Sequence, residues 1–553
     1  MITHELMPPY QPELAERYRA DGLWGDSSIA REFSAVAARH PGGLAVVAEQ
    51  GSLTYAELDE RTDRIGAGLL ELGLRPGDRV IFQVTNRLET VVAWYACLKA
   101  GLVPVATLAA HRAHEIGEIS RLCQAAAHLV EAGLTFDLVA FARDIAANHP
   151  SLRQVITIGT EPSADTVALE TLGSGLDAEA IRSRIDDAQS AVGPDDLAAL
   201  QLSGGTTGVP KLIPRRHAEY WYNAAAYARR LGWTTATKVG HLIPVIHNAG
   251  VTCAIHAAHS CGATLVLGTP DAAASVGLLS RAGVDAALIG HGHFGALLRT
   301  GFLDRLPALR QVLLSGTKIP EPLFDELERR GIWSGQLFGM GEGLFVMSRL
   351  DDPREARLRT VGTALSELDE IRILLPGTEA EAPYGEIGEL CCRGPYTIPG
   401  YYAAAERNAL AFTSEGFYRT GDLARWESYE GRPQLLIEGR IKDVINRGGE
   451  KINAGEIELL LLSHPAIDQA AVVAMPDPRL GERSCAYVVA GAPVDLPLVR
   501  HYLDSLGVAK FKWPERVEQV GELPRTNVGK VDKALLRDRV AAVLGAGTGS
   551  LDG

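Results

Sequence analysis

Cysteine is scarce in this sequence: there are seven among 553 residues, and none belongs to a C-x-x-C pair. An odd number of thiols without that spacing indicates neither a disulfide framework nor a zinc site. Basic runs are missing too, since 54 lysines and arginines are outnumbered by 68 acidic residues and the net charge is −14. This balance argues against a surface that binds polyanions, so we expect no nucleic-acid partner.

Long hydrophobic runs are also missing. No uninterrupted apolar run approaches the ~18 residues that a membrane helix requires. The first ten residues (MITHELMPPY) lack the basic start and apolar stretch of a signal peptide. We therefore expect a cytoplasmic protein with no membrane partner. Hydrophobic residues make up 46% and charged residues 22%, as in an ordinary globular protein. At roughly 100–200 residues per domain, the length suggests about three or four packed units.

The pattern of apolar residues predicts an α/β fold. Residues 1–25 are expected to form an irregular arm. A helix is predicted from residue 53, where Thr54 and Glu57 make a capping box. Short β-rich runs then alternate with longer amphipathic segments, which favours layered, mostly parallel sheets with helices. The alternating pairs are residues 79–84 with 89–100, 103–108 with 114–126, and 284–290 with 294–298.

The texture of the sequence changes twice after residue 360. Short strands and turns predict a small β-rich subdomain at about residues 360–440. After Gly439-Arg440 the strand and helix segments resume. We therefore predict a large N-terminal domain at residues 1–440, a smaller mobile α+β domain at residues 441–545, and a disordered tail at residues 546–553.

The most informative segment is the loop at residues 202–211 (LSGGTTGVPK), which follows the apolar run 197–202. Glycines let backbone N–H groups wrap an anion, hydroxyls add donors, and the lysine adds a positive charge. The spacing is not that of a P-loop, because no Lys-Ser/Thr pair follows the last glycine. The loop predicts binding of a nucleoside triphosphate, by a chemistry different from that of a P-loop NTPase.

Five further segments carry charged residues next to glycines. They are residues 336–342 (QLFGMGE), 418–422 (YRTGD), 439–443 (GRIKD), 446–451 (NRGGEK) and 523–530 (LPRTNVGK). Together with the loop 202–211 and the segment 315–317 (SGT), their order resembles that of the acyl-adenylate-forming superfamily. The resemblance covers the chain from about residue 53 to residue 533.

Within that superfamily the sequence is most similar to the stand-alone aryl-acid adenylating enzymes of siderophore and aryl-capped peptide assembly. The segments that carry this are residues 202–215, His247-Asn248, 338–343 (FGMGEG), 393–402 (RGPYTIPGYY) and 445–452 (INRGGEKI). The resemblance implies that a carboxylate attacks the α-phosphorus of ATP, expelling pyrophosphate and leaving an aryl-adenylate.

Two anions must meet in that reaction, so positive charge and Mg²⁺ are needed. The resemblance implies a metal-placing and catalytic role for Glu342. Asp422 is expected to accept the ribose hydroxyls, with Arg440 beside it. The full set of expected ATP-binding residues is Ser203, Gly204, Gly205, Thr206, Thr207, Gly208, Lys211, Ser315, Gly316, Thr317, Gly339, Asp422 and Arg440.

Two lysines of the C-terminal region complete the implied machinery. Lys530 is expected to be the catalytic lysine that bridges the substrate carboxylate and the α-phosphate. Lys442 stands at the hinge position, where a small backbone change would rotate the C-terminal domain between two half-reactions. In the second half-reaction a phosphopantetheine thiol attacks the adenylate. Few residues follow Lys530, so we expect the acceptor to be a separate aryl carrier protein, with free coenzyme A as the alternative.

The predicted acid pocket departs from the family pattern. Its expected residues are His247, Asn248, Ala249, Cys253, Gly341 and Phe345. By resemblance, Asn248 contacts the ortho substituent of the ring. Ala249-Gly250 replace an aromatic residue and a proline, and Gly341 replaces alanine, which is expected to open space; Phe345 fills some of it. The prediction is an ortho-substituted aromatic acid, with a substituted salicylate, 3-hydroxyanthranilate and a hydroxypicolinate left open.

Each of these features also has an ordinary structural interpretation. Taken alone, the loop 202–211 is often a surface turn, Glu342 a solvated carboxylate, and His247 a hydrogen-bonded core histidine. A third class of function is a binding protein that kept the fold and lost catalysis. The presence of all five charged residues argues against it; they are Lys211, Glu342, Asp422, Arg440 and Lys530.

Overall fold

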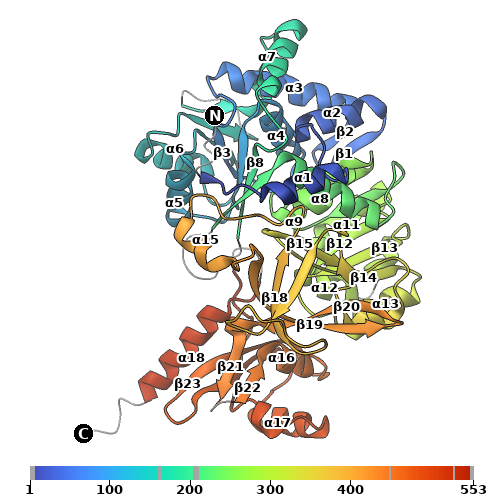
Figure 1. Ribbon diagram of the computed structural model, residues 1–553, viewed down its shortest axis with the longest axis vertical. Coiled ribbons are helices and arrows are strands. Elements are labelled where there is room, and N and C mark those ends of the chain that lie inside the picture. Colours follow the sequence, from blue (N-terminus) through green and yellow to red (C-terminus); the bar gives the residue numbers. More distant parts are fainter. Residues whose placement is uncertain are drawn as a thin grey trace.

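Two large sheets form the upper part of the molecule in Figure 1. The computed structural model describes residues 6–159, 165–203, 211–299, 301–447, 450–526 and 530–547. The first sheet runs in the order β7-β6-β5-β3-β4-β8-β9 and is parallel except for the last pair. Its strands are β3 (Arg79–Gln83), β4 (Val103–Ala106), β5 (Ala127–Glu131), β6 (Gln154–Ile158), β7 (Val167–Ala168), β8 (Leu197–Leu202) and β9 (Leu212–Arg216).

The second sheet runs in the order β16-β15-β14-β13-β12-β10-β11-β1-β2. Its middle is parallel, and β2, β15 and β16 are antiparallel at its two ends. The strands are β1 (Leu44–Ala48), β2 (Gly51–Thr54), β10 (Lys238–His241), β11 (Thr264–Leu267), β12 (Ala286–Gly290), β13 (Gln311–Ser315), β14 (Trp333–Met340), β15 (Gly343–Met347) and β16 (Thr363–Ala364). Parallel strands buried on both faces explain their continuous apolar runs.

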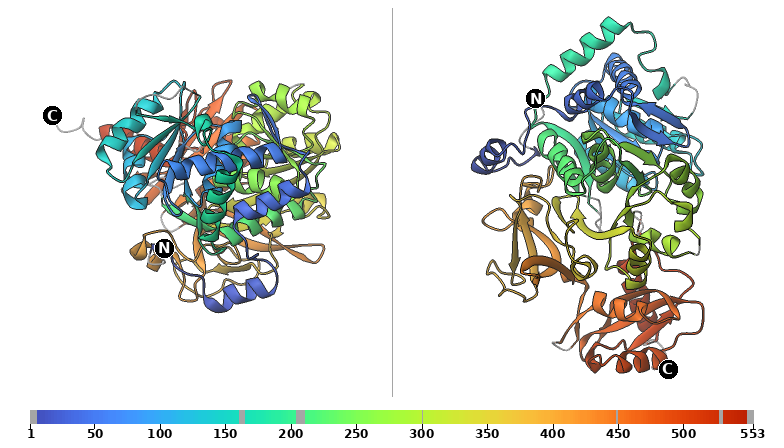
Figure 2. Two further views of the ribbon diagram at one scale, coloured as in Figure 1. Left: turned by 90° about the horizontal axis from the view of Figure 1, so that it is seen from above. Right: turned by 90° about the vertical axis from the view of Figure 1, so that its right-hand side faces the viewer.

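Helices cover the faces of both sheets (Figures 1 and 2). They are α1 (Pro12–Ala20), α2 (Ile29–Arg39), α3 (Tyr55–Glu71), α4 (Leu88–Lys99), α5 (Ala113–Cys123), α6 (Leu138–Asn148), α7 (Ala178–Ser190), α8 (His217–Arg230), α9 (Asn248–Gly250), α10 (Ala257–Ser260), α11 (Ala272–Ala282), α12 (Phe294–Leu298), α13 (Glu321–Arg329) and α14 (Arg354–Arg359). The predicted capping box is present, because the Thr54 side chain accepts from the Glu57 N–H and Glu57 accepts in return from Thr54.

A four-stranded antiparallel sheet lies where the β-rich texture begins. Its strands are β17 (Glu370–Leu374), β18 (Gly388–Arg393), β19 (Tyr418–Tyr429) and β20 (Arg432–Arg440), and α15 (Ala405–Ala411) lies between β18 and β19. The last strand ends at Arg440, where the short 3₁₀ turn η6 (Ile441–Asp443) leads into the C-terminal part.

The C-terminal part forms a separate block at one end of the molecule (Figure 2, right). Its sheet has the order β22-β21-β24-β23, with β25 parallel to β24. The elements are β21 (Val444–Arg447), β22 (Glu450–Asn453), α16 (Ala454–Leu462), β23 (Ile467–Asp477), β24 (Gly481–Ala490), α17 (Leu496–Ser505), β25 (Arg516–Gln519) and α18 (Lys533–Gly547). Helix α18 continues two residues into the segment predicted to be disordered, and residues 548–553 lie outside the described residues.

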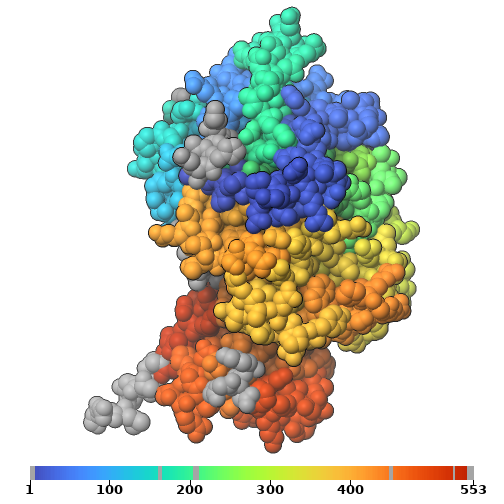
Figure 3. Space-filling model, viewed as in Figure 1, coloured from blue at the N-terminus to red at the C-terminus, as the bar shows by residue number. Residues whose placement is uncertain are grey.

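The N-terminal arm corrects the prediction of an irregular segment. Residues 12–20 form helix α1, which begins at a proline, a favoured first helical position. The arm lies across the boundary between the large sheets and the β-rich part (Figure 3). Trp24 Nε1 donates to the Pro395 carbonyl at 2.8 Å, and the Ala403 N–H donates to the Leu6 carbonyl at 2.8 Å. The arm thus fastens the segment between β18 and α15 to the main body.

Candidate active site

The glycine-rich loop leaves the first sheet between two antiparallel strands. Leu202 at the end of β8 pairs with Leu212 at the start of β9. The Ser203 N–H donates to the Lys211 carbonyl at 3.1 Å, and the Lys211 N–H donates to Ser203 Oγ at 3.1 Å. The two ends of the loop are therefore held together. The predicted phosphate-binding residues Gly204, Gly205, Thr206, Thr207 and Gly208 lie outside the described residues.

Glu342 lies in the turn between β14 and β15, where a tyrosine that contacts a second tyrosine donates to it. The Tyr401 hydroxyl donates to Glu342 Oε1 at 2.7 Å and lies 2.8 Å from the Tyr418 hydroxyl. Lys211 Nζ donates to the same Tyr401 hydroxyl at 3.3 Å and lies 4.5 Å from the centre of its ring. Burial lowers the pKa of Lys211, while Glu342 opposes that shift. The predicted lysine and carboxylate therefore meet around a tyrosine.

A buried arginine fixes the turn that carries Glu342. Arg215 of β9 is fully buried and forms an ion pair with Glu219 on α8. Its Nη1 donates to the Gly341 carbonyl at 2.9 Å, and its Nη2 donates to the Tyr396 carbonyl at 3.2 Å. The Glu342 carbonyl in turn accepts from the Ile398 N–H at 2.8 Å. The turn is thus tied to two other segments, which limits where its carboxylate can lie.

Asp422 and Arg440 face each other across β19 and β20. They are register partners, and Arg440 Nε donates to Asp422 Oδ1 at 2.9 Å. Burial raises the pKa of Asp422, and Arg440 and Lys530 oppose that shift. Arginine holds one carboxylate oxygen, and among the residues that the structure describes no side chain donates a hydrogen bond to the other.

Two glycines border the expected adenine slot. Gly316 follows β13 with φ +103°, and a Cβ there would lie 2.7 Å from His291 Nδ1. Gly339 pairs with Phe345, whose ring would lie 2.8 Å from an added Cβ. Neither position tolerates a side chain without movement of its neighbour. Ser315 ends β13, and Thr317 follows in the exposed turn.

Lys530 of the C-terminal block lies near the residues of the larger part. Its side chain is exposed to solvent, yet the protein groups around it desolvate the ammonium and lower its pKa. The charge of Arg440 lowers this pKa further, while Asp422 and Glu342 oppose the shift. The structure therefore brings Lys530, Asp422 and Glu342 within mutual electrostatic reach. Lys442 lies in η6, and its carbonyl accepts from Arg537 Nη1 of α18 at 3.3 Å.

Asn248 begins α9, which continues into a six-residue π-helix, η3 (Val251–His256). Asn248 Oδ1 accepts from the Tyr220 hydroxyl at 2.9 Å and from Thr252 Oγ1 at 3.4 Å. Tyr220 itself accepts from Gln201 Nε2 at 3.1 Å. The oxygen of Asn248 is therefore occupied, and its Nδ2 makes no hydrogen bond within the described part of the chain.

Two glycines of the predicted pocket do not open the space expected at their positions. A Cβ at Gly250 would lie 2.3 Å from the Val245 carbonyl oxygen, and one at Gly341 would lie 2.7 Å from Ile213 Cδ1. These glycines permit close packing and leave no gap at those points. Cys253 and Phe345, two further expected pocket residues, are buried, and the Phe345 and Tyr227 rings lie edge to face at 6.4 Å.

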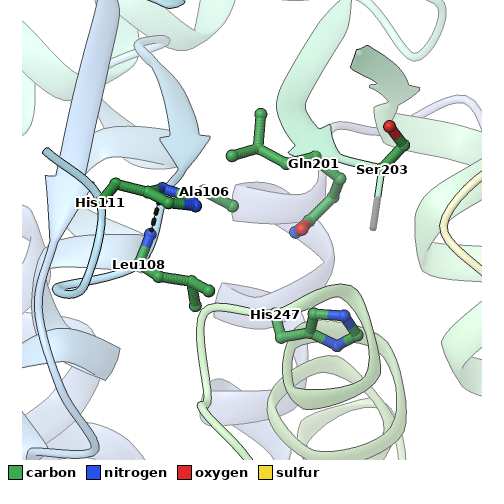
Figure 4. A pocket seen from close by; sticks show the side chains of 7 residues that line it. Ala106, Leu108, His111, Gln201, Ser203 and His247 are labelled. Atoms are coloured by element: carbon green, nitrogen blue, oxygen red, sulfur yellow. Dashed lines mark hydrogen bonds between the residues drawn. The ribbon is translucent and has the colours of Figure 1, made fainter. Parts of the chain in front are cut away.

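His247 precedes α9, and its Nδ1 accepts from the Ala249 N–H at 3.3 Å. Burial, with a contribution from Lys530, lowers the pKa of His247 to about 4, so the ring is neutral at pH 7. A small cavity lies beside it and Ser203 (Figure 4). The cavity is lined by Ala106, Leu108, His111, Gln201, Leu202, Ser203 and His247.

The donor groups at Glu342 fit the coordination that Mg²⁺ prefers. Within the described residues, no three His, Cys, Asp or Glu side chains converge as a metal cluster. Mg²⁺ typically uses one or two carboxylates together with substrate phosphates and water. Glu342 fits that pattern, because only its Oε1 is engaged by a hydrogen bond in the described part of the chain. Among the helices that the structure describes, none is long and apolar enough to span a bilayer.

Comparison with known proteins agrees with this arrangement. The AMP-binding enzyme family matches residues 33–402, and the AMP-binding enzyme C-terminal domain matches residues 456–530. The chain belongs to the AMP-binding enzyme family. The predicted membership of the acyl-adenylate-forming superfamily and the predicted fold class are confirmed, and the protein is an adenylate-forming enzyme that uses ATP.

Two curated relatives match along nearly their whole length. The salicyl-AMP ligase / salicyl-S-ArCP synthetase of Mycobacterium tuberculosis is 38% identical, over 98% of this chain and 95% of the relative. A salicylyl-CoA synthase / salicylate adenylyltransferase of a Streptomyces species is 37% identical, over 98% of each. The apo structure of MbtA from Mycobacterium smegmatis is 35% identical, with a TM-score of 0.69 over 97% of this chain and 99% of that chain.

Several residues of the site were missed by sequence reasoning. Tyr401 and Tyr418 lie inside the segments 393–402 and 418–422 without an expected role, and their place in those segments was the available signal. Arg215 also closed a quoted motif. Gln201 and Tyr220 gave no signal, because one lies in an apolar strand and the other on a helix that reads as core.

Proposed function

We propose that this enzyme activates an ortho-substituted aromatic carboxylic acid, of salicylate or 2,3-dihydroxybenzoate type, as its aryl-adenylate. It then transfers the aryl group to the phosphopantetheine thiol of a separate aryl carrier protein, in siderophore or aryl-capped peptide biosynthesis. The loop of residues 203–211, which ends at Lys211, binds the β,γ-phosphates. Glu342 places Mg²⁺ and Asp422 binds the ribose. Lys530 acts at the reacting carboxylate and the α-phosphate. A bound Mg²⁺ would neutralise the phosphate charge that opposes attack by an anion.

The observation that carries the aryl-acid proposal is the hydrogen-bond direction at Asn248. Gln201 donates to Tyr220, Tyr220 and Thr252 donate to Asn248 Oδ1, and Asn248 is left with N–H groups to offer. An amide donor suits an ortho oxygen or a ring nitrogen that can accept. The nitrogen of an ortho amino group is a weak hydrogen-bond acceptor, because its lone pair is delocalised into the ring. Among the open candidates, this favours salicylate and hydroxypicolinate over 3-hydroxyanthranilate.

The first half-reaction is tested by ATP–pyrophosphate exchange with a panel of aromatic acids. We expect exchange with salicylate, 2,3-dihydroxybenzoate or 3-hydroxypicolinate and much weaker exchange with benzoate and anthranilate. Exchange with none of the ortho-hydroxy or hydroxypicolinic acids defeats the substrate proposal.

The thiol acceptor has two candidates, since one relative is named for an aryl carrier protein (ArCP) and the other for coenzyme A. The preferred candidate is the carrier protein. Its test compares kcat/KM for a pantetheinylated aryl carrier protein with that for free coenzyme A. A preference for free coenzyme A would replace this step with aryl-CoA synthesis.

A further inference from the structure

The hydroxyl of Tyr401 lies at the meeting point of three polar side chains. A phenol has one proton to donate and can accept at its oxygen. The proton goes to Glu342 Oε1 at 2.7 Å. Lys211 Nζ at 3.3 Å is necessarily a donor, and the Tyr418 hydroxyl at 2.8 Å therefore also donates. The direction of every hydrogen bond at Tyr401 follows from these assignments.

Lys211 and Glu342 carry opposite charges and lie on either side of this hydroxyl. A direct ion pair between them would occupy the ammonium and the carboxylate together. In the described part of the chain they form no such pair, and each is instead bonded to the Tyr401 oxygen. The Tyr401 ring also lies under the Lys211 ammonium at 4.5 Å, a distance typical of a cation–π contact.

We propose that Tyr401 is a positioning residue that keeps Lys211 and Glu342 from pairing, so that Lys211 stays free for the phosphates and Glu342 Oε2 for the Mg²⁺ of MgATP. This inference rests on the proposed function of the site. Tyr401 acts through its neighbours and touches neither substrate nor metal.

The tyrosine is held in place by its own surroundings and needs no ligand to position it. Its side chain is fully buried. Its N–H donates to Asn408 Oδ1 at 2.8 Å, and its carbonyl accepts from Asn408 Nδ2 at 3.0 Å. The next residue, Tyr402, donates its N–H to the Leu212 carbonyl at 3.0 Å, close to the end of the glycine-rich loop. The hydroxyl is therefore aimed by the backbone of the segment that carries it.

The test measures divalent-metal binding directly, with Mn²⁺ as the probe, by electron paramagnetic resonance in the presence of a non-hydrolysable ATP analogue. In Tyr401→Phe, Lys211 and Glu342 can pair, and the carboxylate loses a charge-assisted donor. We expect the Mn²⁺ dissociation constant to rise about tenfold. Binding of AMP without metal should stay within about twofold, because AMP needs neither side chain.

The matched control is Tyr402→Phe, which removes a hydroxyl that makes no side-chain hydrogen bond in the described part of the chain. It should leave both constants unchanged. Tyr418→Phe should give an intermediate rise, because Tyr401 then keeps its bond to Glu342. Unchanged Mn²⁺ affinity in Tyr401→Phe overturns the proposal, and so does an equal loss of AMP binding, which would indicate a general structural role. Failure of the wild-type enzyme to activate any aryl acid would instead refute the proposed substrate and leave this titration interpretable.

Discussion

At the scale of single residues, hydroxyl groups decide what the functional side chains present to a ligand. The Tyr220 hydroxyl takes up the oxygen of Asn248, and the Tyr401 hydroxyl takes up one oxygen of Glu342. In both cases one atom of a two-atom polar group is used inside the protein. The other atom remains for the ligand, so the direction of a buried hydrogen bond becomes a statement about specificity.

The direction at Asn248 can be reversed by one substitution. In Asn248→Asp the amide donor becomes a carboxylate oxygen, which accepts. We expect the ratio of kcat/KM for anthranilate over salicylate to rise at least about tenfold, because an ortho amino group donates. Steady-state pyrophosphate exchange measures both constants. An unchanged ratio would remove Asn248 from recognition of the ortho group.

Lys530 is predicted to act on the transition state. Lys530→Ala should lower the rate of adenylate formation by about 10²–10³-fold, because the developing charge on the α-phosphate loses its counter-ion. The dissociation constant for ATP should change little. Lys510→Ala, an exposed lysine in the same block, serves as the control. Full single-turnover activity in Lys530→Ala would exclude this lysine from the chemistry.

At the scale of elements, the site is assembled by the strand-to-helix unit β9–α8. Arg215 lies in β9, the strand that follows the glycine-rich loop, and Glu219 lies four residues later in the first turn of α8. The pair ties the helix to the Glu342 turn through the Gly341 carbonyl. The same helix carries Tyr220, which orients Asn248. One unit thus sets the geometry around Glu342, the proposed metal side, and around Asn248, the proposed acid side.

Breaking the buried pair should therefore affect stability strongly. In Glu219→Gln the arginine keeps its full charge without a counter-ion, which costs about 3–5 kcal/mol. We expect the midpoint of thermal unfolding to fall by about 3–5 °C. Glu326→Gln on α13 removes a half-buried partner of Arg329 and Arg330 at the surface and should lower the midpoint much less. Equal midpoints for Glu219→Gln and the wild type would show that the pair does not hold this region.

Strands of the β-rich part were predictable because glycines and other turn residues separate short β-forming runs; β18 spans residues 388–393 as expected. Helix α1 was missed because the prolines and tyrosines of the arm at residues 1–25 resemble loop composition. The contacts around Glu342 could not be predicted, since Arg215, Tyr401 and Glu342 are distant in sequence and meet only through sheet packing. The expected space at Gly341 was wrong for the same reason: the side chain that fills it, Ile213, belongs to another sheet.

At the scale of the whole molecule, buried neutral histidines make the fold sensitive to acid. Burial lowers the pKa of His128, His217 and His241 to about 3 and that of His259 to about 4. Below about pH 6.5 the unfolded chain binds protons that the folded chain cannot. Stability is therefore lost as the pH falls from about 6.5 toward 4, by about 1.4 kcal/mol per pH unit for each histidine.

The carboxyl group of Asp369 changes the stability with pH in the opposite direction to the histidines. Burial raises the pKa of Asp369 to about 7, so between about pH 4 and 7 it binds a proton in the folded state and releases it on unfolding. At pH 5.5 we expect a net uptake of protons on unfolding, because the buried neutral histidines outnumber this carboxyl; calorimetry in two buffers of different ionisation enthalpy measures it. His217→Asn keeps an acceptor for the Ile29 N–H and should lower the uptake by about one. An uptake that does not change in this variant contradicts the assignment.

The central claim is that residues from the glycine-rich loop, the β-rich part and the C-terminal block act on one ATP to form an aryl-adenylate. The most direct measurement mixes the enzyme with ATP, Mg²⁺ and salicylate or 3-hydroxypicolinate without any thiol, then quantifies the bound products by mass spectrometry. The account predicts aryl-AMP in about one-to-one ratio with the enzyme, together with pyrophosphate. Release of ADP and phosphate, or no adenylate with any ortho-hydroxy or hydroxypicolinic acid, would contradict it.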